Sequence, residues 1–483
     1  MTQKHIFKKD EIIKILDSCL NKTLGEVDSN NVFDKTINKP KITGIAGDVI
    51  EQSVLGYPAD NRQEPDLDIE GIKTELKTTG IKYKNNKKEF VAKEPMSITA
   101  VSPNKIIDET FLESNFWHKL KHILFVYYLY DSPLTVKASQ YANFPIKGYQ
   151  FHEFDSDDTE ILKKDWETVR DFIKYLQDEY ENYEDEYPRI SHELRPKLMY
   201  IDTAPKWPNH PRFRLKRTVV SSIIKEHFGK KMEQLPGKYT SISEIDETCH
   251  KLSEKYSGKS IEELVNLLDI HVNIINKSIG EQIIVKMFGG QSKKMQNIEL
   301  FNKSGIIGKT LTLTERGLRK EDMKLFTIDF EEFYDKDSQF EDSQMYDYFT
   351  NNRFLCIIFK KPHKDAELKE NKFLGFKMIN FDEDFIENDV KQTWSRIKDL
   401  IINNKLENVV IYDRNGNPRK NNNGVIMSAP NFPKSSEGNV FVRGTSSTSD
   451  VKPLNINGIQ MYNQQIWIKG LYIVEKLNKE SYL

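Results

Sequence analysis

The sequence predicts an α/β or α+β fold made of two related domains, each a mixed sheet flanked by helices. Three segments of the first half each have a similar partner in the second half, in the same order and at nearly the same offset. The pairs are 47–56 with 280–289, 123–130 with 354–360, and 161–173 with 389–401. The length of 483 residues agrees, because single domains usually run to roughly 100–200 residues.

Each pair indicates one type of element. The first pair, GDVIEQSVLG and GEQIIVKMFG, has a helical apolar pattern between two glycines. The second pair, ILFVYYLY and FLCIIFK, is apolar throughout and rich in β-branched and aromatic residues, as buried strands are. The third pair is helical and matches Trp166 with Trp394. We therefore predict domains at 1–235 and 261–483, joined by a polar linker at 236–260.

The composition is that of a globular protein with a net charge of −2, so any nucleic-acid binding must come from local basic patches. Two such patches stand out, at 81–94 and 205–217, although a solvated surface is the simpler interpretation of each. No apolar run approaches the roughly 20 residues that cross a bilayer, and no signal peptide is visible. The three cysteines are far apart and lack metal-ligand spacing. We expect a cytoplasmic protein without a membrane partner.

The residues with the clearest chemistry lie in EPDLDIEGIKTELKTTG at 64–80. The segment predicts a hairpin in which Gly71 forms the turn and residues 74–78 form the second strand. Because side chains alternate along a strand, Glu75 and Lys77 share one face while Leu76 points into the core. Asp66 lies on the neighbouring strand and can face them.

Such a set suits hydrolysis of a phosphodiester bond. Asp66, Glu75 and the carbonyl of Leu76 are hard oxygen ligands of the kind that Mg²⁺ prefers. Bound Mg²⁺ polarises a phosphate and lowers the pKa of water, and Lys77 can orient the resulting hydroxide. Upstream, Glu51 lies on a predicted helix and can complete the metal shell or position a water.

The pattern of PD followed by ExK also arises by chance in charged proteins, and a solvated hairpin edge is then the explanation. The upstream helix with Glu51 and the strand alternation favour a functional site.

Several ordered pieces resemble the MutH family of PD-(D/E)xK nucleases. This family includes a mismatch-repair nicking endonuclease and two-domain type II restriction endonucleases that cut at GATC. The pieces are GDVIEQSVLG at 47–56, EPDL at 64–67, GI at 71–72, ELKTTG at 75–80, FLESNFWHKL at 111–120, the Trp166 helix, ELRPK at 193–197 and FRLKRTVVSSIIKEHF at 213–228.

The resemblance implies two restriction-endonuclease-like domains and a catalytic set. The family's helix glutamate, motif aspartate and ExK pair fall on Glu51, Asp66, Glu75 and Lys77. It also implies DNA-binding residues at Lys119, Arg195, Lys197 and Lys216. Arg195 is a candidate reader of a guanine edge, because an arginine can bind two acceptors in the major groove. Surface solvation is the alternative for Arg195 and Lys216.

One departure from the family leaves open which aspartate binds the metal. The family usually has a glycine two residues before the ExK glutamate, whereas Gly71 precedes Glu75 by four. Two residues are therefore inserted in the hairpin, and the family's own spacing would select Asp68. We prefer Asp66, because it follows Pro65 and an even insertion keeps the same strand face.

The second half resembles the family's inactive domain, which binds DNA and regulates the first. The position of Glu51 is taken by Ile284 and that of Glu75 by Ile307, whereas Lys309 is retained. Arg443 and Lys469 remain as candidate phosphate contacts.

The sequence thus favours a type II restriction endonuclease that cuts double-stranded DNA with Mg²⁺, as a monomer or a DNA-induced dimer. A MutH-type nicking enzyme is an alternative, although that enzyme has one domain. A non-catalytic DNA-binding protein is a second alternative, and the intact Glu51, Asp66, Glu75 and Lys77 set argues against it.

Overall fold

The computed structural model describes residues 5–40, 42–58, 64–84, 89–132, 136–204, 209–319, 321–413, 415–420, 424–446 and 451–483. These residues group into two compact units. The first unit contains the described residues up to 248 together with 284–307, and the second contains 249–283 and the described residues from 308 onward. The division runs through helix α12 (Ile279–Met287) and strand β10 (Ile306–Leu313).

The domain boundaries inferred from the sequence, 1–235 and 261–483, remain a prediction. The segment 236–260, which we expected to be a linker, contains the helix α10 (Ile242–Tyr256). Its residues Ile245, Cys249, Ser253 and Tyr256 are buried, so one face of this helix is packed.

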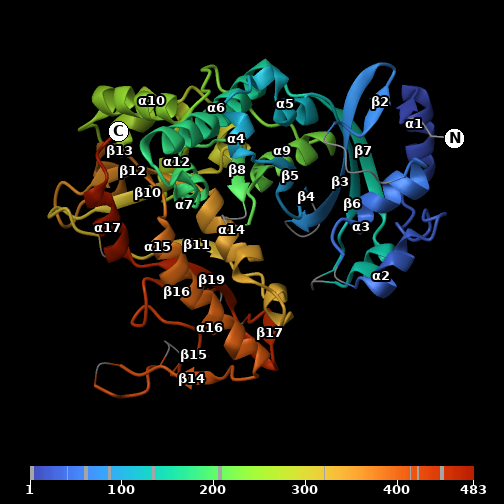
Figure 1. The fold of residues 1–483 in the computed structure, drawn as a ribbon. Coiled ribbons are helices and arrows are strands. Elements are labelled where there is room, and N and C mark those ends of the chain that lie inside the picture. The colour runs from blue at the N-terminus through green and yellow to red at the C-terminus, as the bar shows by residue number, and fades with distance from the viewer. Residues whose placement is uncertain are drawn as a thin grey trace. The chain divides into compact units, whose positions relative to one another are not determined.

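The first unit is built around a mixed sheet of strands in the order β1-β2-β3-β6-β7, with β4 also paired to β3 (Figure 1). β3 is parallel to β6, and β1 is parallel to β2. β2 and β4 run antiparallel to β3, and β7 runs antiparallel to β6. Every residue of β6 is buried, which explains its continuous apolar sequence. The bounds are β1 (Ile6–Phe7), β2 (Leu67–Ile69), β3 (Ile72–Lys84), β4 (Glu89–Ala92), β6 (Ile123–Leu129) and β7 (Ile146–His152).

Helices cover both faces of this sheet. α1 (Lys9–Cys19) and α3 (Ile45–Val49) share a core cluster with Leu76 and with alternate residues of β6. On the other face, the rings of Phe125 and Tyr127 stack, and Tyr127 lies 5.4 Å from His227 of α9 (Arg217–His227). Successive residues of β3 and β6 therefore face different helices.

A second, smaller sheet of the first unit has the order β5-β9-β8. Its strands are β5 (Met96–Ala100), β9 (Arg212–Leu215) and β8 (Ile201–Ala204). The 24-residue helix α6 (Ser156–Glu179) buries Trp166, Val169 and Ile173 on one face.

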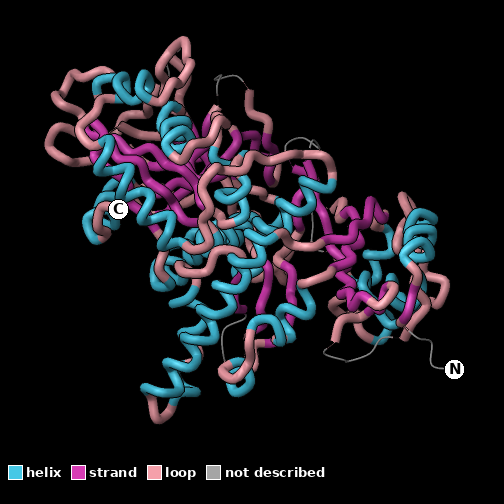
Figure 2. Tube along the Cα trace, turned by 90° about the horizontal axis from the view of Figure 1, so that it is seen from above, coloured by secondary structure: helices cyan, strands magenta, loops and turns pink. Residues whose placement is uncertain are grey.

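The second unit repeats this arrangement. Its sheet β10-β12-β13 matches β3-β6-β7, and its sheet β11-β19-β16 matches β5-β9-β8. The strands are β11 (Met323–Thr327), β12 (Arg353–Lys360), β13 (Lys372–Ile379), β16 (Val440–Thr445) and β19 (Asn463–Ile468). Helices α14 (Gln344–Asn351), α16 (Lys391–Ile402) and α17 (Gly470–Lys479) take the chain positions of α5 (Asn115–Leu120), α6 and α9. The tube in Figure 2 shows the strands of both units bordered by helices.

The predicted fold class, two related mixed-sheet domains flanked by helices, is therefore confirmed. The predicted buried strands are β6 and β12, and the predicted Trp helices are α6 and α16, with Trp166 and Trp394 buried. Within the described residues, the helices are too short or too polar to cross a lipid bilayer.

The remaining described elements are short helices and hairpins. They are α2 (Lys35–Asn38), α4 (Pro103–Ile106), α7 (Tyr183–Glu186), α8 (Arg189–Leu194), α11 (Ile261–Leu267), α13 (Glu299–Lys303), α15 (Glu383–Phe385), β14 (Asn408–Val410), β15 (Ser428–Pro430), β17 (Leu454–Ile456) and β18 (Ile459–Met461).

Candidate active site

The predicted hairpin is formed by β2 and β3, in which Ile69 pairs with Ile72. The two linking residues, Glu70 and Gly71, both have positive φ, at 53° and 88°. This is the backbone of a tight two-residue hairpin turn, which Gly adopts without strain. The Asp68 carboxylate accepts a hydrogen bond from the Gly71 amide at 2.8 Å and lies 3.3 Å from the Lys73 ammonium. Asp68 therefore closes the turn.

Asp66 lies just before β2 and points toward the middle of β3. Its Oδ2 accepts a hydrogen bond from the backbone amide of Leu76 at 2.9 Å. The amide of Glu75 donates instead to the carbonyl of His122, which precedes β6. Because alternate residues of a strand direct their amide and carbonyl groups to opposite neighbours, the Leu76 carbonyl lies on the Asp66 side. Asp66 and this carbonyl thus share one edge of β3.

Glu75 is surrounded by two lysines. Its side chain is nearly fully buried, and its two oxygens each lie 3.0 Å from the Lys119 ammonium. The Lys77 ammonium donates to Oε1 of Glu75 at 2.8 Å. Lys119 comes from α5, whose first turn is capped by Ser114, which accepts from the Trp117 amide at 3.1 Å. The crossover between β3 and β6 therefore delivers a second cation to the ExK glutamate.

The electrostatics of Asp66 reflect burial and its acidic neighbour. Burial raises the pKa of the Asp66 carboxyl, and the negative charge of Glu75 raises it further. The Leu76 amide and the charges of Lys119 and Lys77 act in the opposite direction. A cation between Asp66 and Glu75 would relieve their repulsion, so this carboxylate pair favours a bound metal ion.

The available donors fit Mg²⁺. Among the described residues, there is no group of three or more His, Cys, Asp or Glu side chains arranged to bind a metal. A metal here would therefore use the carboxylates of Asp66 and Glu75, the Leu76 carbonyl and water. Mg²⁺ commonly binds in this way, with one or two carboxylates and several retained waters.

Glu51 lies on a π-helical turn, Ile50–Val54, that continues α3. Single π-helical turns are frequent at functional sites. The backbone carbonyl of Glu51 accepts from the Tyr57 amide at 3.0 Å, and its side chain is partly exposed. The participation of Glu51 in catalysis stays a prediction.

The residues expected at DNA differ in their surroundings. Arg195 and Lys197 directly follow α8, where Arg195 is partly exposed and Lys197 is exposed, with its ammonium 5.9 Å from the Phe172 ring. Lys216 is only 1% exposed, and its ammonium donates to the Leu198 carbonyl at 2.7 Å. The structure therefore differs from the sequence interpretation of Lys216, which placed it near DNA.

The reason for this difference is a buried carboxylate that the sequence analysis missed. Asp165 accepts hydrogen bonds from the amides of Met199, Tyr200 and Ile201 at 2.7 to 3.1 Å, and Lys216 lies close enough to act on its charge. The detectable signal was an aspartate beside Trp166 on the apolar face of α6. Asp165 and Lys216 together fix the chain directly after the Arg195–Lys197 segment.

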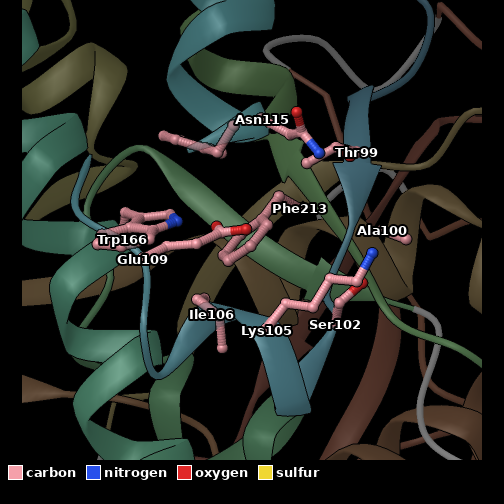
Figure 3. Close-up of a pocket in the computed structure, with 10 residues that line it drawn as sticks. Thr99, Ala100, Ser102, Lys105, Ile106, Glu109, Asn115, Trp166 and Phe213 are labelled. Carbon is pink, nitrogen blue, oxygen red and sulfur yellow. The ribbon is translucent and has the colours of Figure 1, made fainter. Parts of the chain in front are cut away.

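A small cavity in the same unit does not contribute to this site. It measures about 30 Å³ and is lined by residues that include Glu109, Trp166 and Phe213 (Figure 3). This is space for about one water molecule, which is too small for a nucleotide. Burial raises the pKa of Glu109, and no predicted site residue lines the cavity.

The corresponding strand β10 lacks the acidic residue that β3 carries. On β10, Ile307 and Lys309 stand where β3 has Glu75 and Lys77, and Ile284 is fully buried on α12. Arg443 of β16 pairs with Asp322 at 2.7 Å. Lys469 precedes α17, as Lys216 precedes α9.

Comparisons with known proteins agree with these observations. Residues 55–165 match the family model described as DNA mismatch repair enzyme MutH, a segment that includes Asp66, Glu75, Lys77 and Lys119. Over 476 residues, the chain is 25% identical to the type II restriction enzyme Sau3AI of Staphylococcus aureus. That match covers 89% of this chain and 91% of the enzyme. The resemblance to the MutH family, and to its two-domain restriction enzymes, is thus confirmed.

Proposed function

We propose that this member of the MutH family is a type II restriction endonuclease that makes Mg²⁺-dependent double-strand breaks in DNA. The observation that supports it most directly is the convergence of Asp66, Glu75, Lys77 and Lys119 at one edge of β3. Two acidic groups beside two ammonium groups suit a metal ion and a phosphate at once. The similarity to Sau3AI over nearly the whole of both chains supports the same conclusion.

The metal ligands in this proposal are the carboxylates of Asp66 and Glu75 and the carbonyl of Leu76. When bound there, Mg²⁺ supplies a Lewis acid that polarises the scissile phosphate and makes its water more acidic. The Leu76 amide orients Asp66 by donating to Oδ2, which leaves Oδ1 for the metal. Glu51 positions a water or completes the metal shell.

The lysines act on the phosphate and the attacking water. In the structure, both Lys77 and Lys119 are bound to Glu75, so their positive charge is already inside the site. We assign Lys77 to orienting the hydroxide and Lys119 to binding a nearby DNA phosphate. Both ammonium groups offset the charge that develops on the phosphate oxygens, an effect that is strongest where water is excluded.

The DNA-binding groups in this proposal are Arg195 and Lys197, with Arg195 as a candidate base reader. Lys216 serves them indirectly, because it holds the Leu198 carbonyl just after the segment. The second unit binds DNA through Arg443 and Lys469 and regulates the first. The recognition sequence is GATC by family resemblance, and the enzyme acts in the cytoplasm as a monomer or a DNA-induced dimer.

Digestion of a plasmid with several GATC sites tests the proposal. We expect linear fragments with Mg²⁺ and none with EDTA, and mapping of the ends should place every cut at one short sequence. Nicked circles would identify a MutH-type nicking enzyme instead. Intact plasmid, at protein concentrations that bind the DNA fully, would favour a non-catalytic DNA-binding protein.

A further inference from the structure

One cavity of the second unit lies beside the strand that corresponds to the ExK strand. Its volume is about 390 Å³, and its walls come from β10, β11, the start of α12 and Trp467 of β19. Four of its lining residues are cationic, namely Lys277, Lys309, Arg319 and Lys324.

Arg319 is the most deeply buried of these cations, at 7% exposed. Its Nε donates to the backbone carbonyl of Glu321 at 2.8 Å. Within the described ranges, this is the guanidinium's one hydrogen bond, and no carboxylate forms an ion pair with it. A guanidinium has five N–H donors, so most of the donors of Arg319 remain for a ligand.

Lys309 is the second cation, and it is partly buried. Its ammonium lies 3.4 Å from the Lys324 carbonyl, a long hydrogen bond, and 4.9 Å from the Phe354 ring centroid. It too has no ion pair among the residues that the structure describes. Burial lowers the pKa of Lys309 to about 8, which shows that its positive charge is poorly compensated.

Three carboxylates, Glu281, Glu321 and Asp322, also line the cavity, and the described residues show no ion pair between them and Arg319 or Lys309. Asp322 pairs with Arg443 at 2.7 Å and accepts from the Gly470 amide at 3.2 Å. Glu321 lies 3.7 Å from Lys277, and both of those side chains are exposed. Burial has the largest effect on the pKa of Lys309, and the negative charge of Glu281 acts against it.

The first unit shows what this site has lost. There, Lys77 and Lys119 are neutralised by Glu75, and Asp66 adds a second carboxylate. On β10, the position of Glu75 is Ile307, so Lys309 keeps its charge without its partner, and Arg319 adds another. The loss of the acid turns a site suited to a metal cation into one suited to an anion.

We propose that this cavity binds a phosphate group without a metal ion, through Arg319 and Lys309. A phosphate presents oxygens in several directions, so it can accept from the planar fork of Arg319 and from the Lys309 ammonium together. The phosphate comes either from a nucleic-acid backbone or from a small free phosphate. The proposal does not require the first unit to be a nuclease.

The experiment uses the full chain in EDTA, so that hydrolysis plays no part. Thermal unfolding is measured in inorganic phosphate and in chloride at equal ionic strength. Binding of a DNA duplex is measured as a function of salt concentration. The variants are Lys309→Met, Arg319→Met and the charge-preserving Arg319→Lys. Lys479→Met is the matched control, because Lys479 is an exposed lysine on the distant end of α17.

We expect phosphate to stabilise the wild type, Arg319→Lys and the control. Lys309→Met and Arg319→Met should bind phosphate about tenfold or more weakly, because a charge-assisted hydrogen bond is lost. If the ligand is a DNA phosphate, the salt slope of duplex binding also falls by about one for Lys309→Met. An unchanged slope with lost phosphate binding assigns a small free phosphate.

Equal phosphate stabilisation in the wild type, Lys309→Met and the control would overturn the proposal. So would an absence of phosphate stabilisation in the wild type together with an unchanged salt slope. Lys309→Met keeps the test decisive if Arg319→Met fails to fold. Failure of the plasmid digestion would refute the nuclease proposal and leave this one standing.

Discussion

The ExK strand β3 and its counterpart β10 occupy similar positions in their sheets but carry different charged residues. Each pairs with a strand that is buried along nearly its whole length, β6 or β12, and both carry a lysine at the same position. They differ in the residue two positions earlier, which is Glu75 in one and Ile307 in the other. The difference indicates that the scaffold depends on the apolar strands, whereas the charge around the shared lysine depends on a single acidic group.

The retained lysines show this most clearly. Lys77 lies 2.8 Å from a carboxylate, and Lys309 lies against an aromatic ring and a backbone carbonyl. The positive charge of Lys77 is balanced by Glu75, whereas Lys309 has no such carboxylate, because Ile307 takes the place of Glu75.

The largest effect is expected at Glu75. Glu75→Gln should lower DNA cleavage by on the order of 10³-fold, because it removes a metal ligand and the partner of both lysines. Duplex binding in EDTA should stay within a few-fold of the wild type, since affinity comes mainly from phosphate contacts. Initial rates on a plasmid measure the first effect, with the exposed Glu64→Gln as the control. Cleavage at the wild-type rate by Glu75→Gln, at matched Mg²⁺, would remove Glu75 from the site.

The two aspartates of the hairpin should differ. Asp66→Asn is expected to lower cleavage about 100-fold, because an amide is a weak ligand for Mg²⁺. Asp68→Asn should leave cleavage within a few-fold and lower stability by about 1 kcal/mol, since it weakens the bond to the Gly71 amide. Cleavage rates and urea unfolding separate the two roles. The opposite ranking of the cleavage rates would assign the metal to Asp68.

A substitution that gives β10 the acidic residue of β3 tests the comparison between the two strands. Ile307→Glu should abolish stabilisation by phosphate, because the new carboxylate lies on the same strand face as Lys309 and neutralises it. It should not create cleavage by the second unit. Phosphate-dependent unfolding, measured beside Ile307→Gln, distinguishes the charge from the loss of the isoleucine. If phosphate stabilised Ile307→Glu as much as the wild type, the proposed equivalence of Ile307 and Lys309 with Glu75 and Lys77 would be wrong.

The lysines that precede α9 and α17, Lys216 and Lys469, should also differ. Lys216→Met is expected to lower stability by about 1–3 kcal/mol, because it leaves the Leu198 carbonyl and Asp165 without their buried donor and charge. Lys469→Met, at a partly exposed position, should change stability by less than about 0.5 kcal/mol. Urea unfolding of both variants measures this. Equal costs would mean that the two lysines have the same role.

The last expected effect is a pH dependence of stability from Lys309. Its pKa is about 8 in the folded chain, below the ordinary value of 10.5, so the unfolded chain binds more protons between these values. The stability of the wild type relative to Lys309→Met should therefore be greatest above pH 10.5 and fall as pH drops toward 8. The slope is at most about 1.4 kcal/mol per pH unit. Unfolding in urea without phosphate, at several pH values across this window, measures the difference. A flat difference would show that Lys309 is fully solvated.

The sequence by itself determined the order of the elements, the hairpin that presents Asp66, Glu75 and Lys77, and the loss of acids at Ile284 and Ile307. These features depend on local periodicity, on turn chemistry and on repeated segments, all of which are visible along the chain. The fold class and the core strands followed from the same patterns.

Only the tertiary structure decided which charges meet. Lys119 contacts Glu75, 44 positions away in the sequence. Asp165 accepts a hydrogen bond from the amide of Met199, more than 30 positions away. Lys216 and Arg319 look like ordinary surface cations in the sequence, yet both are buried. Burial and ion pairing are set by segments that are distant along the chain, so no local pattern encodes them. The charge of each site depends on these contacts, because a buried cation is neutralised only where a carboxylate lies beside it.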